Sequence, residues 1–111
     1  MTEEKMKEVV SKFAEEAKKI YGAKLQEIIL YGSCARGDFD QDSDIDLLVL
    51  LNVPTVNINA ERNRILDAAD KLDLDYDVVL APVFQNYSLY QKYTPVSVFF
   101  QNVQKEGVKI A

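Results

Sequence analysis

Apolar residues recur at helical spacing through the N-terminal part of the chain. The residues that share one helical face are Met6, Val9, Val10, Phe13, Ala17 and Ile20. This spacing is typical of an amphipathic helix that packs one stripe against a core. We therefore expect a helix from about Thr2 to Tyr21, with Thr2 as its N-cap and Gly22 ending its last turn.

Two shorter apolar segments follow and predict strands. Leu25 to Tyr31 is continuously apolar toward its end, which is typical of a buried strand. The segment from Gly32 to Asp42 is rich in small and charged residues and predicts a turn, with one helical turn at Ser33–Arg36. Ile45 to Leu51 then predicts the second strand.

The middle of the chain predicts a loop, a helix and a strand. Pro54 and three asparagines indicate a loop over Asn52 to Asn59. Leu74 to Leu80 predicts a third strand, which Pro82 ends. Between them we expect a helix from about Ala60 to Leu72, because apolar residues fall at helical spacing at Ile65, Leu66, Ala69 and Leu72.

The C-terminal segment predicts a last helix. Thr94-Pro95 is typical of an N-cap followed by proline at the first helical position, and Gly107 is a suitable end. The apolar stripe of this helix is Val96, Phe99, Phe100 and Val103. The order helix, strand, strand, helix, strand, helix predicts an α/β (α+β) fold, a small mixed sheet of three to four strands flanked by helices.

Composition fits one folded domain over residues 1–111 and excludes several classes of function. The chain is 48% hydrophobic and 28% charged, the balance of a soluble globular domain. Its net charge of −5 argues against direct non-specific binding to nucleic acid. Because there is no histidine, histidine-based triads, general bases and zinc sites are excluded.

The cytoplasm is the expected location. No run approaches the roughly 18 apolar residues of a membrane span, so no membrane association is expected. The N-terminus does not resemble a signal peptide. The single cysteine, Cys34, excludes an internal disulfide and fits a reducing compartment. We expect Cys34 to be a small buried residue rather than a reactive thiol.

The chemistry-bearing residues lie at the ends of the first two predicted strands. Gly32-Ser33 follows the first strand, and a Gly-Ser turn exposes backbone N–H groups to an anion. Asp44 and Asp46 lie one residue apart at the start of the second, so they point to the same face of an extended strand. Their carboxylates repel each other unless a cation or proton lies between them. This pattern predicts a site for a magnesium–nucleotide complex.

Two better-known motifs match only in part. Gly32 and Gly37 have the spacing of a phosphate-binding loop, but Asp38 stands where that loop needs its lysine. Asp40, Asp42 and Asp44 begin like an EF-hand loop. That loop fails at its sixth and twelfth positions, which are Ile45 and Leu51 instead of glycine and glutamate.

The remaining pattern is a hydrophobic residue and Gly-Ser, ten residues, Asp-hydrophobic-Asp, and a later hydrophobic-Asp-hydrophobic. It resembles the nucleotidyltransferase superfamily typified by DNA polymerase beta. The segments Leu30–Asp38 (LYGSCARGD) and Ser43–Val49 (SDIDLLV) resemble its minimal nucleotidyltransferase (MNT) branch. Asp77, in Tyr76-Asp77-Val78-Val79, matches the third carboxylate of that family.

The resemblance implies a role for each of these residues. Gly32 and Ser33 would hold the β- and γ-phosphates of ATP or another nucleoside triphosphate. Asp44, Asp46 and Asp77 would form a catalytic two-metal site for Mg²⁺, with Mn²⁺ as the alternative. The third carboxylate would orient or deprotonate the attacking hydroxyl. The reaction would transfer AMP from ATP and release pyrophosphate.

Some assignments stay open at this stage. Asp75 also lies between hydrophobic residues, so it competes with Asp77 as the third carboxylate. Arg36 would bind a phosphate, although a solvated turn arginine is the plain alternative. Tyr87, Tyr90 and Tyr93 have a spacing that usually indicates packing.

Proteins of the MNT branch resemble the antitoxin half of a two-gene pair with a helical HEPN-domain ribonuclease. The resemblance therefore implies that AMP is transferred to a tyrosine of a HEPN-type toxin. One alternative is a non-catalytic subunit that inhibits its partner by contact, for which the acidic surface suits a basic partner. Another is a small-molecule adenylyltransferase.

Overall fold

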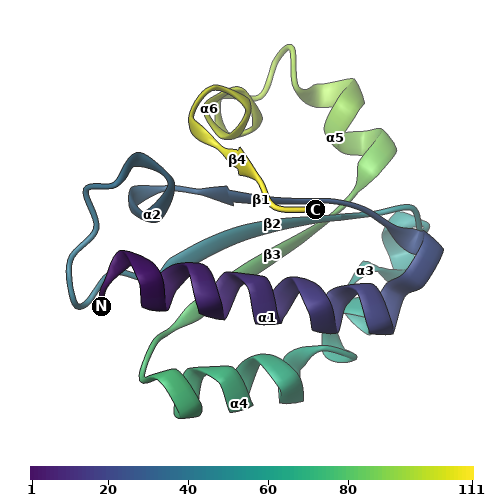
Figure 1. Cartoon of the computed structure of the whole chain (residues 1–111). Helices are drawn as coiled ribbons and strands as arrows, with labels where there is room; N and C mark the ends of the chain where they lie inside the picture. Colours follow the sequence, from purple (N-terminus) through teal and green to yellow (C-terminus); the bar gives the residue numbers. More distant parts are fainter.

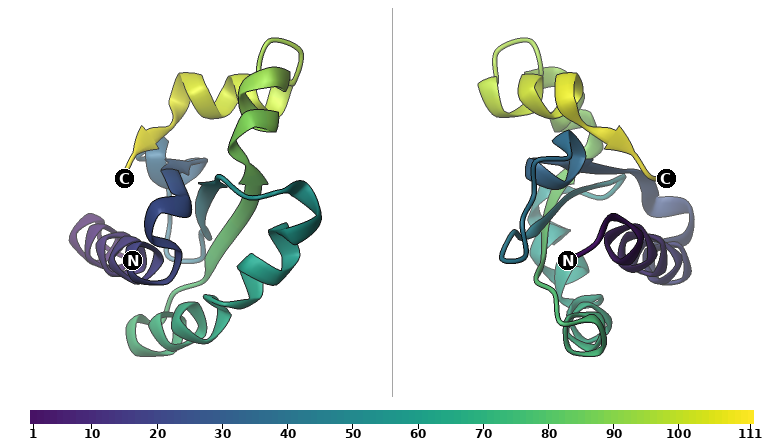
Figure 2. Two further views of the ribbon diagram at one scale, coloured as in Figure 1. Left: turned by 90° about the vertical axis from the view of Figure 1, so that its right-hand side faces the viewer. Right: turned by 60° about the vertical axis from the view of Figure 1, so that its left-hand side comes forward.

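The computed structural model describes residues 1–111 and shows a mixed sheet between two layers of helices (Figure 1). Helices α1 and α4 cover one face of the sheet, and α5 and α6 cover the other (Figures 1 and 2). The strands are β1 (Leu25–Tyr31), β2 (Ile45–Leu51), β3 (Leu80–Asn86) and β4 (Val108–Lys109). The helices are α1 (Glu3–Tyr21), α2 (Ser33–Arg36), α3 (Ile58–Asn63), α4 (Leu66–Tyr76), α5 (Tyr87–Tyr93) and α6 (Val98–Glu106). Two 3₁₀ turns cover Gly22–Lys24 and Thr55–Asn57.

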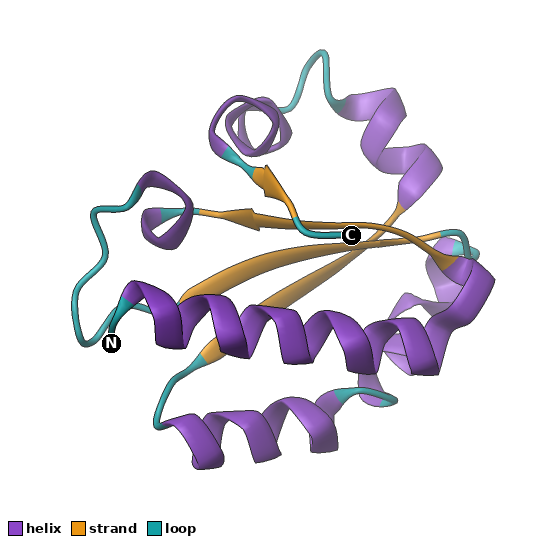
Figure 3. Cartoon of the chain, in the orientation of Figure 1, coloured by secondary structure: helices purple, strands orange, loops and turns teal.

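The strands lie in the order β3-β2-β1-β4. β1 runs antiparallel to both β2 and β4, whereas β2 and β3 are parallel (Figure 3). The register pairs Tyr31 with Asp46 across β1 and β2, and Asp46 with Ala81 across β2 and β3. The Gly-Ser turn after β1 therefore lies beside the start of β2.

Alternation along β2 divides the core into two clusters. Ile45, Leu47, Val49 and Leu51 belong to a cluster of 20 buried residues that also includes the apolar stripe of α1. Leu48 and Leu50 point the other way, into a cluster of 6 buried residues under α5 and α6. Because side chains alternate along a strand, Asp46 lies on the α5–α6 face. One face of β2 thus contributes side chains to the main core, and the other face carries Asp46 together with Leu48 and Leu50.

The structure confirms the predicted fold class and the first four predicted elements. Thr2 is the N-cap of α1, with its hydroxyl accepting the Lys5 N–H at 3.1 Å, and Gly22 follows the helix at a φ of 54°. β1, the turn of helix α2 and β2 have the predicted bounds.

The predicted strand over Leu74–Leu80 is wrong, and so are the bounds of the helix before it. The segment predicted as one helix over Ala60–Leu72 forms α3 and α4, and α4 continues to Tyr76. Leu74 is 85% exposed on that helix, so its hydrophobicity does not indicate a strand. The strand β3 starts at Leu80 and runs through Pro82, which an edge strand tolerates because one side of it needs no ladder hydrogen bonds.

Three other predictions need correction. The N-cap of α6 is Ser97, whose hydroxyl accepts the Phe100 N–H at 3.2 Å, whereas Thr94 is buried and donates to Tyr90 O at the end of α5. α5 and β4 were not predicted as elements. One further prediction agrees with the structure: the spacing of Tyr87, Tyr90 and Tyr93 indicates packing, and Tyr90 is buried against Phe100 with 5.0 Å between ring centroids. The predicted loop Asn52–Asn59 contains a 3₁₀ turn and the start of α3.

Tyr21→Phe is expected to lower stability by about 1 kcal/mol near neutral pH. The Tyr21 side chain is 3% exposed, and its hydroxyl donates to Glu61 O at 2.6 Å. Burial, followed by the charge of Glu61, raises the pKa of Tyr21 to about 12 from 10.0. The neutral tyrosine therefore stabilises the fold below pH 10, and this contribution is lost as pH rises toward 12. Urea unfolding at neutral and alkaline pH should show a larger loss of stability in the wild type than in Tyr21→Phe; Tyr93→Phe, at an exposed residue, is the control.

Candidate active site

Asp44 and Asp46 lie at the start of β2. Ile45, between them, is fully buried and donates its N–H to Val79 O at 2.8 Å, which anchors this end of the strand to β3. Asp46 is half-buried and Asp44 is exposed. A buried apolar residue between two carboxylates thus fixes the backbone while both acids remain accessible to a ligand.

The two carboxylates repel each other. Burial and then the charge of Asp44 raise the pKa of Asp46, while the Arg36 guanidinium lowers it. Asp46 also raises the pKa of Tyr31, its cross-strand neighbour, after the larger effect of burial. A cation between Asp44 and Asp46 would remove this repulsion.

Gly32 places the predicted phosphate cradle against this pair. Its φ is 72°, which few residues other than glycine adopt, and a β-carbon at Gly32 would overlap Oδ2 of Asp46. Ser33 then starts α2, whose Ala35 and Arg36 N–H groups both donate to Gly32 O at 3.1 Å. The N–H groups of Ser33 and Cys34, the first two residues of α2, have no acceptor within the helix and are therefore available to an anion.

Cys34 ties α2 to β2. Its thiol lies 3.6 Å from Asp44 O in hydrogen-bonding geometry, and the side chain is buried. Burial, followed by the charge of Asp46, raises the pKa of the thiol. The prediction of a small buried residue rather than a reactive thiol agrees with this environment.

Arg36 is engaged with two carboxylates. Its Nε lies 3.2 Å from Asp38 Oδ2, and its Nη1 lies 3.2 Å from Glu106 Oε2. All three side chains are partly exposed, and ion pairs of this kind contribute little to stability. A triphosphate can therefore compete for the guanidinium, so phosphate binding by Arg36 stays a prediction.

Asp77 does not lie on a strand. It follows α4 at a φ of 53° and a ψ of 54°, the one non-glycine residue with a positive φ. The β3 residue that pairs with Asp46 is Ala81. The prediction that a strand carries Asp77 beside the pair is thus wrong, and no group of three or more acidic, Cys or His side chains could hold a metal ion.

Asp77 still lies near the loop before Asp44. Together with Asp42, Ser43 and Val79 it lines a cavity of about 310 Å³. Asp75 instead lines a cavity with Lys12 of α1 and Tyr76. Of the two open choices for a third carboxylate, only Asp77 borders the loop that precedes Asp44, and neither Asp44 nor Asp46 lines that cavity.

Asp73 supports the start of β3 and was not among the residues predicted from the sequence. Its Oδ1 accepts the N–H of Leu80, the first residue of β3, at 2.9 Å. Burial raises the pKa of this carboxyl, the hydrogen bond lowers it, and Asp70 and Asp44 raise it further. Asp73 therefore helps to set where β3 begins against the strand that carries the pair. The one sequence feature that points to Asp73 is its spacing: it lies four residues, about one helical turn, after the apolar Ala69.

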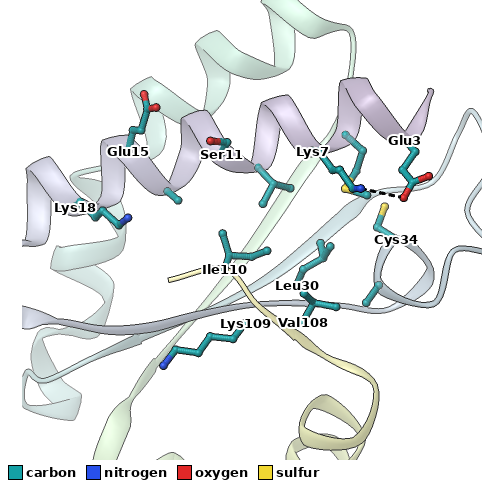
Figure 4. Close-up of a pocket in the computed structure, with 14 residues that line it drawn as sticks. Glu3, Lys7, Ser11, Glu15, Lys18, Leu30, Cys34, Val108, Lys109 and Ile110 are labelled. Atoms are coloured by element: carbon teal, nitrogen blue, oxygen red, sulfur yellow. Dashed lines mark ion pairs between the residues drawn. The ribbon is translucent and has the colours of Figure 1, made fainter.

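The largest cavity lies away from the carboxylates. It has a volume of about 520 Å³ and lies between α1 and the C-terminal strand (Figure 4). Figure 4 shows Leu30 and Ile110 pointing into it, Cys34 at one end, and the Glu3–Lys7 ion pair of 3.3 Å beside Cys34. Neither Asp44 nor Asp46 lines this space.

The donor set at the pair fits a divalent metal. Mg²⁺ sites in nucleotide enzymes use one or two carboxylates and take their other ligands from substrate phosphates and water. Asp44 and Asp46 supply two such carboxylates, with an exposed approach and a repulsion that a cation relieves. The arrangement suits the binding of a metal-bound polyphosphate between this pair and Gly32.

Comparisons with known proteins agree with this chemistry. Two relatives from Methanocaldococcus jannaschii are named "Putative protein adenylyltransferase MJ0141" and "Putative protein adenylyltransferase MJ0604". The first is 34% identical over 93% of this chain and 96% of the relative. The second is 35% identical over 96% of each.

Solved structures share the fold. A structure described as a "putative minimal nucleotidyltransferase" has a TM-score of 0.61 at 18% identity, covering 97% of this chain and 95% of the other. A crystal structure of a toxin–antitoxin with AMP-PNP has a TM-score of 0.54 at 22% identity, covering 91% of this chain and 72% of the other.

None of the helices has the length and apolar character needed to cross a membrane.

Residues 10–103 match the nucleotidyltransferase domain family. This match covers most of the chain, and the two archaeal relatives match nearly all of it. The chain therefore belongs to the nucleotidyltransferase domain family and is a nucleotidyltransferase.

Proposed function

We propose that this nucleotidyltransferase transfers AMP from ATP to a hydroxyl of a partner macromolecule, a tyrosine of a HEPN-type toxin, and so acts as an antitoxin. The observation that carries the proposal is the contact between the Gly32 turn and the Asp46 carboxylate. A polyphosphate bound at the turn would have its α-phosphorus beside the aspartate pair. The names of the two archaeal relatives support a protein acceptor.

Each residue at the site has a proposed task. The N–H groups at the start of α2, with the Ser33 hydroxyl, bind the β- and γ-phosphates, and Arg36 neutralises part of their charge. The acceptor oxygen attacks the α-phosphorus, the bond from that phosphorus to the bridging oxygen breaks, and pyrophosphate leaves. The proton of the hydroxyl passes to a carboxylate of the site. Most of the catalysis comes from positioning and charge neutralisation.

Asp44 and Asp46 would hold Mg²⁺, or Mn²⁺ in its place. When bound, the metal neutralises negative charge on the triphosphate and the leaving pyrophosphate. Asp77 is the proposed third carboxylate of a two-metal site, approaching from the segment before β3 rather than from a strand. Its position in the same cavity as Ser43 supports this choice over Asp75.

The toxin partner is supported by the fold. The solved neighbour with a TM-score of 0.54 comes from a toxin–antitoxin structure with AMP-PNP. The net charge of −5 also suits a basic partner. We expect the cytoplasm as the location of both proteins.

The proposal is tested by incubating the protein with Mg²⁺, ATP labelled in the α-phosphate, and the product of the adjacent open reading frame. Label should move to that product and should be lost when its acceptor tyrosine is changed to phenylalanine. ATP labelled in the γ-phosphate is the control and should leave the partner unlabelled. Label on a small molecule alone would indicate a small-molecule adenylyltransferase instead.

Asp77→Asn is expected to lower the transfer rate about tenfold or more, whereas Asp75→Asn leaves it unchanged. Asparagine keeps the left-handed backbone of Asp77 accessible, so the substitution removes charge without adding strain. Initial rates of label transfer for the two variants provide the measurement. Equal rates for Asp77→Asn and wild type would remove Asp77 from the proposed site.

A second candidate function is contact inhibition without catalysis. The observation in its favour is that Ala81, not a carboxylate, pairs with Asp46 on the neighbouring strand. The double variant Asp44→Asn/Asp46→Asn separates the two candidates in cells that express the toxin. Protection equal to that of the wild type would establish contact inhibition, and loss of protection would establish catalysis.

A further inference from the structure

A small cavity borders the Gly32 turn on the α5–α6 face of the sheet. It has a volume of about 190 Å³, and Gly32 and Tyr31 at the end of β1 form one side. Phe99, Asn102 and Glu106 of α6 form the other. The space is smaller than the roughly 300–1,000 Å³ that holds a whole drug-sized ligand, so it suits one ring system. Since Gly32 also contacts Asp46, a group in this cavity would lie next to the carboxylate pair.

Aromatic rings form the apolar wall of this cavity. The Tyr31 and Phe99 rings meet edge to face, with 5.4 Å between centroids and an interplanar angle of 84°. Phe100, the next residue of α6, is buried, and its ring centroid lies 5.7 Å from that of Phe99. Phe99 itself is 43% exposed. A ring fixed in this way offers a surface on which a planar ligand can stack.

Polar groups lie at the rim of the same cavity. The Asn102 side chain has no hydrogen-bond partner within the chain, so its amide donor and acceptor are both available. The Arg36–Glu106 ion pair joins α2 to α6 beside it. An aromatic wall with one free amide is the combination that binds a nucleobase, by stacking and by hydrogen bonds to its edge.

Resting on the proposed function, we propose that this cavity binds the base of the substrate nucleotide, with Phe99 stacking on it and Asn102 reading its edge. An asparagine amide pairs in two-point fashion with N6 and N7 of adenine, so the expected base is adenine. The α6 helix then contributes to nucleotide selection, while Gly32 and the aspartate pair act on the phosphates.

The cavity fits a base better than a phosphate. The Arg36 guanidinium in its lining is already shared with Asp38 and Glu106, the Asn102 amide is uncharged, and the remaining lining residues are aromatic or apolar. An additional phosphate would face the Glu106 carboxylate without a free cation. A neutral planar ring meets no such repulsion.

The test compares two probes on two variants of the full chain. Calorimetry measures the affinities of MgATP and of magnesium tripolyphosphate, which lacks base and ribose. Phe99→Leu should weaken MgATP binding about tenfold or more and leave tripolyphosphate binding unchanged. Phe99→Tyr keeps an aromatic face and should restore the ATP affinity. Val98→Ala, at a neighbouring residue that is 71% exposed and outside the cavity, should change neither affinity.

Each other outcome decides between the base site and the proposed function. Unchanged MgATP binding by Phe99→Leu, with normal binding by the wild type, would overturn the base site and leave the proposed function standing. Equal weakening of both probes would also overturn it, because Phe99 would then act on the phosphate cradle. Wild-type protein that binds neither probe would overturn the proposed function itself. For Asn102→Ala, the ratio of ATP to GTP affinity should fall; an unchanged ratio would contradict its role in reading the base.

Discussion

Asp44→Asn and Asp46→Asn should each lower the rate of nucleotidyl transfer by about a thousandfold, a magnitude typical of removing one preorganised electrostatic contact and a metal ligand together. In the proposed site, each carboxylate would supply negative charge to the cation that accompanies the triphosphate. Asparagine keeps the shape of the side chain and removes that charge. The measurement is the initial rate of label transfer from α-labelled ATP to the partner.

The fold should survive both substitutions. Burial and Asp44 raise the pKa of Asp46, so its charge opposes folding when no cation is present. Asp46→Asn should therefore unfold at the same or a higher temperature than the wild type. Added Mg²⁺ should raise the unfolding temperature of the wild type and not that of the variants. Asp67→Asn, at an exposed residue of α4, is the matched control; a wild-type rate in Asp44→Asn or Asp46→Asn would contradict the metal-binding role.

Gly32→Ala should abolish nucleotide binding and lower stability by about 2 kcal/mol or more. A β-carbon at Gly32 would overlap the Asp46 carboxylate, and the backbone there has a positive φ. Either the carboxylate or the turn must move, and each movement separates the cradle from the pair. Calorimetry with MgATP and urea unfolding measure the two effects.

Gly37→Ala is the matched control for the backbone effect. Gly37 also has a positive φ, of 84°, but a β-carbon there would meet no atom within 4 Å. This variant should lose only about 1 kcal/mol of stability and keep its ATP affinity. If Gly32→Ala bound ATP as well as Gly37→Ala does, the Gly32 turn would not be the phosphate cradle.

The first half of the fold could be predicted because local patterns there coincide with the contacts that form. Val9, Phe13 and Ala17 lie on one helical face, and the same residues are fully buried against the sheet. The Gly32–Asp46 contact follows from a short antiparallel connection that pairs Tyr31 with Asp46. Sequence spacing therefore suffices to bring the cradle and the pair together.

The second half depends on contacts that sequence spacing does not reveal. Between Leu72 and Leu80, apolar residues alternate as in a strand, yet Leu72 and Tyr76 also share a helical face that packs on the main core. The helix forms, and the start of β3 is then set by the Asp73–Leu80 and Ile45–Val79 hydrogen bonds. The position of Asp77 depends on where β3 starts. The prediction that Asp77 lies on a strand was therefore wrong.

The contribution of α6 to the proposed base cavity could not be predicted from the sequence either. Phe99 was predicted as part of an apolar stripe, and it does contact Phe100 and Tyr31. Its partial exposure beside Gly32 depends on how α6 crosses the end of β1, which no local pattern encodes.

Mass spectrometry of the partner tests the central claim most directly. The product of the adjacent open reading frame is incubated with the wild-type protein, Mg²⁺ and ATP, and its intact mass is measured. The account predicts a gain of one AMP group or a whole number of them, which is absent with Asp44→Asn/Asp46→Asn. An unchanged mass, a gain of phosphate alone, or the same AMP gain with the double variant would contradict it.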